Sequence, residues 1–232
     1  MQLLWDNRLN MLEAFGRTLE MMLLGGLIAL VVGFFLAGLR VSPINVARFV
    51  GAAYVNVVRN TPLLVIMFIF AFGLPELDIR PELNLNRVFG TDFDLLNFNT
   101  FFIFATSALG LYTAAFICEA VRSGINSVAV GQAEAARSIG MTFGQTLFQV
   151  VFPQAFRAVV PPLVSVLIAM TKNTTVALGV GVTEATFLMS KLANDHTSQI
   201  WWLFGGFAVG YMILVFSLAG IGNAIERRVR VS

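Results

Sequence analysis

The sequence predicts an all-α integral membrane protein, a single domain over residues 1–232 with five transmembrane helices. Hydrophobic residues make up 57% of the chain and charged residues only 12%, far from the composition of a soluble domain. The apolar residues form runs near the roughly 20 residues with which an α-helix crosses a bilayer. Polar segments separate these runs. Together these observations exclude a soluble enzyme, a disordered chain and a secreted disulfide-rich module.

The five expected spans follow the apolar runs. They cover approximately residues 18–39, 49–74, 101–121, 155–182 and 201–221. The first could be mistaken for a secretory signal, but Asp6, Glu13 and Glu20 precede it and no small-residue cleavage pattern follows it. We therefore interpret it as a helix that the protein retains.

Small residues recur every four positions in the first span, at Gly25, Ala29, Gly33 and Ala37. Such a face lets a neighbouring helix approach closely. The sequence leaves open whether the neighbour belongs to the same subunit or to a second one.

The second and fourth spans are irregular. Arg59 and Pro62 interrupt the second span. The fourth contains Pro161, Pro162 and Lys172. Irregular backbone is tolerated at membrane depth only where it is packed in protein or lines a cavity. These two spans are therefore predicted to line a translocation pathway.

Lys and Arg predict that the N-terminus lies outside and the C-terminus in the cytoplasm, because nine basic residues fall on one side of the spans and five on the other. The larger group contains Arg40, Arg48, Arg59, Arg122, Arg137, Arg157, Arg227, Arg228 and Arg230, and the smaller contains Arg8, Arg17, Arg80, Arg87 and Lys191. Residues 75–100 then form an external acidic loop, and residues 128–153 a cytoplasmic segment.

Few residues suited to catalysis are present. His196 is the single histidine and is expected in an external loop, while Cys118 lies in an apolar span. The sequence contains no G-x-x-x-x-G-K-[ST] phosphate loop. No metal site and no catalytic residue is predicted, and an ATPase that powers transport would be another polypeptide.

The cytoplasmic segment at residues 128–153 is too polar for lipid and is predicted to form a helix, a turn and a second helix. Gly140 suits the left-handed position that closes the first helix. Thr142 and Gln145 have the spacing of a capping box that opens the second. Pro153 suits a break before the fourth span. Such a helix could dock on another protein or lie as an interfacial linker.

The same segment resembles the EAA motif of ABC importer permeases. Glu134-Ala135-Ala136 is followed by three residues, Gly140, nine residues and Val150-Val-Phe152-Pro153. The family pattern is EAA, three residues, Gly, nine residues and I-x-L-P, so the spacing agrees and only the Ile and Leu positions differ.

Three further stretches are similar to permeases of the polar amino acid family, which serves histidine, glutamate, glutamine, arginine and opines. They are Arg59-Asn-Thr-Pro62-Leu-Leu in the second span, Tyr112-Thr-Ala-Ala-Phe-Ile-Cys-Glu119-Ala-Val-Arg122-Ser-Gly124-Ile in the third, and Lys172-Asn-Thr-Thr175 in the fourth. Together the resemblances cover most of residues 18–225, and the pattern is most similar to glutamate-type permeases of actinobacteria.

This resemblance implies a type I ABC importer permease fold with a cytoplasmic coupling helix between spans three and four. It implies a permease subunit, not an enzyme, of an ATP-driven importer in the bacterial cell membrane that carries glutamate or a related polar amino acid. The implied partners are a dimer of cytoplasmic ATP-binding subunits, which hold ATP and Mg, a second permease in a heterodimer, and an extracytoplasmic amino-acid-binding protein. The chain itself would hold no cofactor.

The resemblance also assigns residues. Glu134, Ala135, Ala136, Gly140 and Pro153 become ATPase-coupling residues. The candidate substrate pathway comprises Arg59, Asn60, Thr61, Glu119, Lys172, Asn173, Thr174 and Thr175.

Several of these pathway residues have a structural alternative. Lys172 could bind substrate, because an ionised group inside a span is costly, or it could pair with Glu119. The polar residues around it, and Arg59 with Asn60, could instead satisfy backbone groups freed by prolines. The family commonly has Asp where this chain has Asn173, and the missing negative charge favours an anionic substrate.

Two other classes of protein could contain similar spans. A secondary carrier or small channel also uses broken helices and an intramembrane Lys, but it has no need of a spaced coupling motif. An intramembrane enzyme would need a buried base, and the single His196 argues against one.

Overall fold

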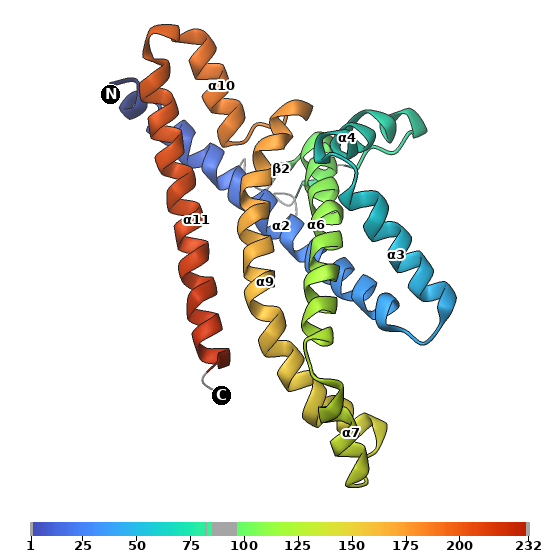
Figure 1. The fold of residues 1–232 in the computed structure, drawn as a ribbon. Helices are drawn as coiled ribbons and strands as arrows, with labels where there is room; N and C mark the ends of the chain where they lie inside the picture. The colour runs from blue at the N-terminus through green and yellow to red at the C-terminus, as the bar shows by residue number, and fades with distance from the viewer. Residues whose placement is uncertain (1, 82, 85–96, 231–232) are drawn as a thin grey trace.

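The computed structural model describes residues 2–81, 83–84 and 97–230, and almost all of them are helical (Figure 1). The α-helices are α1 (Gln2–Asp6), α2 (Arg8–Val41), α3 (Asn45–Arg59), α4 (Leu63–Phe68), α6 (Thr100–Asn126), α7 (Val130–Ser138), α8 (Phe143–Gln145), α9 (Phe152–Asn173), α10 (Ala185–Asp195) and α11 (Ile200–Arg230). The π-helical turns are Ile69–Gly73 and Thr146–Val151, and the 3₁₀ segments are Pro75–Leu77, Thr174–Val180 and Thr197–Gln199. Two short antiparallel strands, β1 (Leu83–Asn84) and β2 (Asn97–Phe98), pair with Leu83 opposite Phe98. Half of the expected external loop at residues 75–100 lies outside the described residues.

Within the residues that the structure describes, four helical stretches are long and apolar enough to cross a membrane. They are Arg8–Val41, Thr100–Asn126, Phe143–Val180 and Thr197–Arg228. A fifth span exists if Asn45–Arg59 and Leu63–Leu77, which are bent by 102° relative to each other, count as one. These long apolar helices overlap the apolar runs of the sequence, although α2 begins at Arg8, well before the expected start near residue 18.

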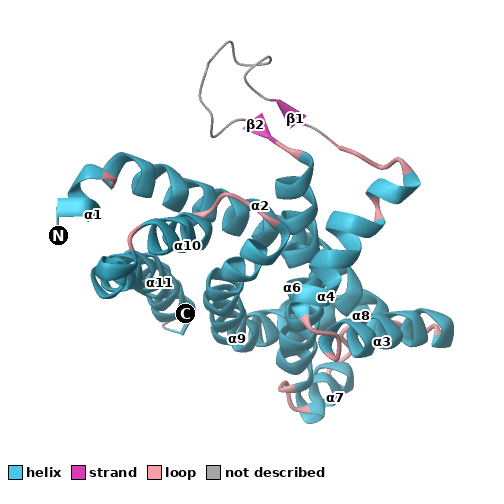
Figure 2. Ribbon diagram, turned by 90° about the horizontal axis from the view of Figure 1, so that it is seen from above, coloured by secondary structure: helices cyan, strands magenta, loops and turns pink. Residues whose placement is uncertain are grey.

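Helices α2, α6 and α9 form the centre of the molecule, with α3 and α4 on one side and α10 and α11 on the other (Figures 1 and 2). The small-residue face of α2 packs on α6, and all four of its members are buried. A Cβ placed on Gly33 would lie 2.7 Å from the Ile117 Cβ, and one on Gly110 would lie 2.8 Å from the Gly25 carbonyl oxygen. This face therefore packs inside one subunit, and close approach of α2 to α6 requires glycine there.

The second span breaks where the sequence places Pro62. Helix α3 ends at Arg59 and α4 begins at Leu63. Pro62 is extended (ψ 136°), and it has no N–H with which to continue the hydrogen-bond ladder of α3. This interruption was predicted correctly.

The expected interruptions in the fourth span lie elsewhere. Helix α9 continues through Pro161 and Pro162, whose fixed φ is helical, so that they remove hydrogen bonds without turning the chain. The predicted break at Pro153 is also wrong. Val151 and Phe152 are helical, Pro153 lies in the first turn of α9, and the π-helical turn before it joins α8 to α9. The helix instead tightens into the 3₁₀ segment Thr174–Val180, which Gly181 ends with φ +78°.

Candidate functional site

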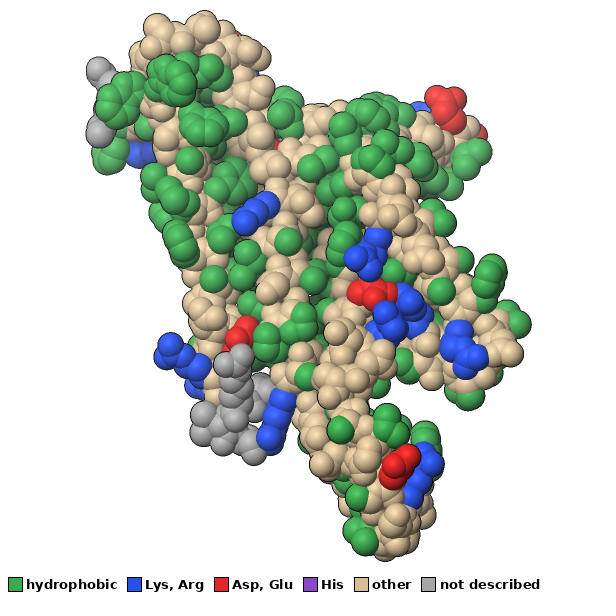
Figure 3. Space-filling view, in the orientation of Figure 1, with side chains coloured by type: hydrophobic (Ala, Val, Ile, Leu, Met, Phe, Trp, Pro, Cys, Tyr) green, Lys and Arg blue, Asp and Glu red, His purple; other side chains and the backbone are tan. Residues whose placement is uncertain are grey.

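The α7–α8 hairpin forms a tip that projects beyond the other helices at one end of the molecule, the end at which α11 also terminates (Figures 1 and 3). Helix α7 ends in a Schellman motif. The Gly140 N–H donates to the Arg137 carbonyl at 2.9 Å, and the Met141 N–H donates to the Ala136 carbonyl at 3.1 Å. Gly140 has φ +88°, as its predicted role in closing this helix requires.

Thr142 opens the second helix of the tip with the predicted capping box. Its hydroxyl accepts from the Gln145 N–H at 3.3 Å, and its own N–H donates to the Gln145 side-chain oxygen at 2.9 Å. The two motifs together fix the direction in which the chain reverses between α7 and α8.

Large apolar side chains are exposed on the surface of the tip. Ile139 is 81% exposed, Val130 73% and Phe143 69%. Glu134 and Ala135 are not buried either, whereas Ala136 is buried within the hairpin. Of the EAA triplet, the first two residues are therefore available to another protein and the third packs the hairpin together.

Glu119 on α6 is the centre of an ion cluster that joins three helices. Its carboxylate pairs with Arg40 of α2, with Arg122 at 3.0 Å and with Arg59 of α3 at 4.0 Å. The suggested pairing of Glu119 with Lys172 is therefore wrong. Arg40 and Arg59 from two other helices, and Arg122 from α6 itself, already surround this carboxylate.

Lys172 lies at the C-terminal end of α9, and its side chain is exposed. It forms no ion pair with any residue that the structure describes. Its neighbour Asn173 lines a cavity of about 180 Å³ between α6 and α9. The other lining residues are Tyr112, Thr113, Phe116, Val166, Ala169 and Met170.

Two features of this α6–α9 cavity stand out. The Thr113 hydroxyl is buried with no hydrogen-bond partner among the described residues. The Arg59 guanidinium lies 5.3 Å from the ring centroid of Phe116, which lines the cavity. The structure thus brings Arg59 and Asn173 to the same α6–α9 region. Thr113 was not predicted from the sequence, because a threonine in an apolar helix is ordinarily a packing residue.

The remaining pathway candidates bond to nearby backbone. The Asn60 amide donates to the Asn56 carbonyl at 2.7 Å, and Thr61 donates to Val57 at 2.8 Å. In the fourth span, the Thr174 and Thr175 hydroxyls each donate at 2.8 Å to carbonyls three residues earlier. These bonds help to satisfy helix ends and the 3₁₀ transition, and the hydroxyl oxygens keep their capacity to accept.

A second polar centre, which was not predicted from the sequence, surrounds the buried Glu184. Its carboxylate caps α10 by accepting from the Phe187 N–H at 3.1 Å, and it also accepts from the hydroxyls of Tyr211 at 2.8 Å and Thr18 at 3.2 Å. Helices α2, α10 and α11 therefore meet at one carboxylate. Burial raises the pKa of Glu184 above its ordinary value of 4.5.

This pKa predicts a pH dependence of stability. The folded protein holds the Glu184 proton more tightly than the unfolded chain does, so the free energy of unfolding should fall as the pH rises above about 4.5 and through the folded pKa. The measurement is the unfolding temperature of the detergent-purified protein at a series of pH values. In the Glu184→Gln variant, the unfolding temperature should depend less on pH over that range. Asp195→Asn, at an exposed acid of the same helix, is the matched control. If the unfolding temperature of Glu184→Gln changes with pH as steeply as that of the unsubstituted protein, Glu184 is not the group responsible.

Comparisons with known proteins agree with one another. Residues 29–231 match the family described as "Binding-protein-dependent transport system inner membrane component". The chain is 40% identical to the glutamate transport system permease protein GluC of Corynebacterium glutamicum, over 98% of each chain. It is 33% identical to the probable glutamine ABC transporter permease protein GlnM of Bacillus subtilis, over 99% of this chain and 98% of the relative. Among solved structures, "Crystal structure of an amino acid ABC transporter with histidines" superposes with a TM-score of 0.80 at 26% identity, covering 97% of this chain and 96% of that one.

Proposed function

The chain belongs to the family of binding-protein-dependent transport system inner membrane components, and from this premise we propose that it forms half of the translocation pathway of an importer for glutamate or a related polar amino acid. It is a multi-pass membrane protein and a transport subunit, and ATP hydrolysis lies in a separate subunit. A secondary carrier and an intramembrane enzyme are set aside on the same ground. The partners are a pair of cytoplasmic ATP-binding subunits, which bind ATP and Mg, a second permease and an external amino-acid-binding protein.

The coupling role falls to the α7–α8 tip. The apolar residues at its end are largely exposed, and a groove in the ATP-binding subunit would cover them. Glu134 and Ala135 lie on the accessible part of α7, and the Schellman motif at Gly140 sets the angle between the two short helices. Closure of the ATP-binding subunits on ATP would then move the tip together with α9. With this role, the tip and the C-terminus lie in the cytoplasm and the N-terminus lies outside.

The substrate pathway runs past the α6–α9 cavity. The observation that supports it most directly is the buried Thr113 hydroxyl, which has no partner among the described residues and belongs to a residue that lines the same cavity as Asn173. A passing carboxylate could accept from both groups. Asn173 carries no negative charge to repel that carboxylate, and Arg59 and Lys172 supply positive charge at either end of the region.

Reconstitution tests this function. The permease purified with its co-expressed partner subunits would be placed in liposomes with ATP inside and binding protein outside, and labelled glutamate, glutamine, aspartate and arginine would be offered in turn. ATP-dependent accumulation of one or more of the acidic or amide amino acids is expected. Accumulation driven by an ion gradient without ATP would refute the assignment.

Lys172→Ala is expected to slow this uptake about tenfold, equivalent to roughly 1.4 kcal/mol of lost interaction with the passing substrate. The amount of protein in the membrane should change little, because Lys172 makes no ion pair with the described residues. Lys172→Arg, which keeps the charge, is the matched control. Equal losses of uptake and of protein in the Ala variant would indicate a structural role.

A further inference from the structure

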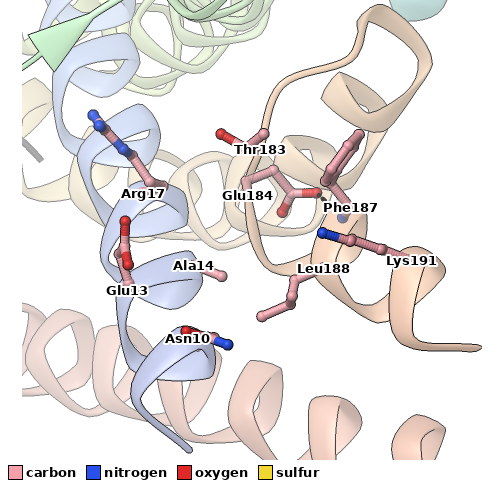
Figure 4. A pocket seen from close by; sticks show the side chains of 9 residues that line it. All are labelled: Asn10, Glu13, Ala14, Arg17, Thr183, Glu184, Phe187, Leu188 and Lys191. Atoms are coloured by element: carbon pink, nitrogen blue, oxygen red, sulfur yellow. Dashed lines mark hydrogen bonds between the residues drawn. The ribbon is translucent and has the colours of Figure 1, made fainter. Parts of the chain in front are cut away.

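A pocket of about 340 Å³ lies between the first turns of α2 and helix α10, away from the α6–α9 cavity (Figure 4). Its volume falls in the lower part of the range typical of small-molecule sites. On the α2 wall, Asn10, Glu13, Ala14 and Arg17 recur at spacings of three and four, so they share one helix face. On the other wall, Thr183 and Glu184 precede α10, and Phe187, Leu188 and Lys191 share one face of it.

Each wall carries one acid and one base, Glu13 and Arg17 on α2 and Glu184 and Lys191 at α10. Helix α2 and helix α10 run in opposite directions past the pocket, because Thr18 meets Glu184 at its inner end. Glu13 on α2 therefore lies across the pocket from Lys191 on α10 (Figure 4). No ion pair within 4.0 Å joins these two side chains. Both side chains are exposed and line the pocket, so each is accessible to a ligand.

The base of the pocket is rigid and polar. The Glu184 carboxylate is fully buried and is already held by the Phe187 N–H and by the hydroxyls of Thr18 and Tyr211. These bonds fix the start of α10 against α2 and α11. The side chain of Ala14 on the facing wall is small. A base that is already held in place needs no further ordering when a ligand binds, which lowers the entropic cost of binding.

We propose that this α2–α10 pocket binds a free α-amino acid as a zwitterion. Its α-carboxylate would accept from Lys191 and its α-ammonium would donate to Glu13, so that the ligand completes a charge pair that the protein leaves open. Asn10 and Arg17 lie within the same walls and would contact the side chain of the ligand. A simple anion or cation satisfies only one of the two facing charges and leaves the other unpaired.

The position of the pocket gives this site a role. Residues 174–183 connect Asn173, at the α6–α9 cavity, to Glu184 at the base of the pocket. The pocket is thus an outer site on the segment that leads into the proposed pathway, distinct from the pathway residues themselves. The choice of an amino acid as physiological ligand rests on the proposed function, whereas the preference for a zwitterion rests on the facing charges alone.

Protection of Lys191 from chemical modification tests the site directly. The permease with its partner subunits, in nanodiscs and without the binding protein, would be treated with a sulfonated succinimidyl ester, and modification of Lys191 would be followed by peptide mass spectrometry. Because the amine of a free ligand also consumes this reagent, modification of Lys191 would be expressed relative to that of exposed lysines on the partner subunits in the same sample. L-Glutamate and L-glutamine should each slow modification at least about fivefold at saturation, because a bound carboxylate covers the ammonium group. Glutarate, which lacks the ammonium, and 1,5-diaminopentane, which lacks the carboxylates, should not.

Glu13→Gln should abolish this protection, while Asp195→Asn, at an exposed acid that does not line the pocket, should leave it intact. Exchange of the two charges, Glu13→Lys with Lys191→Glu, should restore glutamate binding measured by calorimetry, because the zwitterion can bind reversed. Equal protection by glutarate, or none by either amino acid, overturns the proposal. Protection without ATP-driven uptake would refute the transport function and leave this site standing, so the two failures are distinguishable.

Discussion

Gly140→Val is expected to abolish ATP-dependent uptake while the permease still inserts into the membrane. Gly140 holds φ +88°, a conformation that costs a β-branched residue about 1–3 kcal/mol. The turn can relieve this strain only by breaking the Schellman bonds from the Gly140 and Met141 N–H groups, which would swing α7 away from α8. Uptake into proteoliposomes, divided by the amount of permease, is the measurement, together with recovery of the ATP-binding subunits in pull-downs.

Gly144→Val is the matched control. Gly144 lies in α8 close to the same tip and has no positive φ, and a Cβ added to it would have nothing within 4 Å, as is also true of Gly140. The two substitutions add the same side chain to equally open space, so only the backbone conformation distinguishes them. Loss of uptake confined to Gly140→Val supports coupling through the turn. Normal uptake by Gly140→Val would refute it, and equal losses in both variants would point to steric blockage of the docking surface.

Glu119→Gln is expected to destabilise the folded permease strongly. Removal of this charge leaves Arg40, Arg59 and Arg122 close together with no carboxylate between them. Breaking a fully buried pair costs about 3–5 kcal/mol, and partial exposure of this cluster reduces the expected loss to roughly 2–3 kcal/mol. A lower unfolding temperature and a lower yield of monodisperse protein in detergent are the measurements.

The effect of Glu119→Gln should be partly reversed by a second substitution. Arg40→Gln in the same chain removes one of the opposed cations, so the double variant should be more stable than Glu119→Gln alone. Glu226→Gln, on α11 and outside the cluster, controls for loss of an acid. Stability unchanged by Glu119→Gln, with uptake lost, would assign Glu119 to the pathway and not to the architecture.

Local patterns in the sequence were sufficient to predict several helices and the turn within the α7–α8 tip. Apolar runs located α6, α9 and α11, Pro62 located the break in the second span, and Gly140 with Thr142 set the two caps. Each of these features depends on residues within a few positions of one another. A pattern of this kind needs no knowledge of how the helices pack.

Features that depend on packing could not be predicted in the same way. The sequence suggests Lys172 as a partner of Glu119 because both are charged residues in apolar spans, but α2 and α3 bring Arg40 and Arg59 to Glu119 instead. Glu184 is a lone acid in a polar connector, and only the meeting of α2 and α11 at that point buries it. The prolines of α9 were misjudged because a proline removes a hydrogen bond without fixing where the backbone bends.

The continuity of the helix that replaces the expected break at Pro153 has a mechanical consequence. Residues Phe143–Val180 form a single stretch of 38 residues, about 55 Å long at the helical rise, with the tip at one end and Asn173 close to the other. A rod of this length acts as a lever, because a small rotation at the tip becomes a larger displacement at the far end. The helix should bend most easily at the π-helical turn and at Pro161–Pro162, where regular hydrogen bonds are missing. Substitutions there should change how much of the displacement of the tip reaches the cavity, without changing the binding of the tip to its partner.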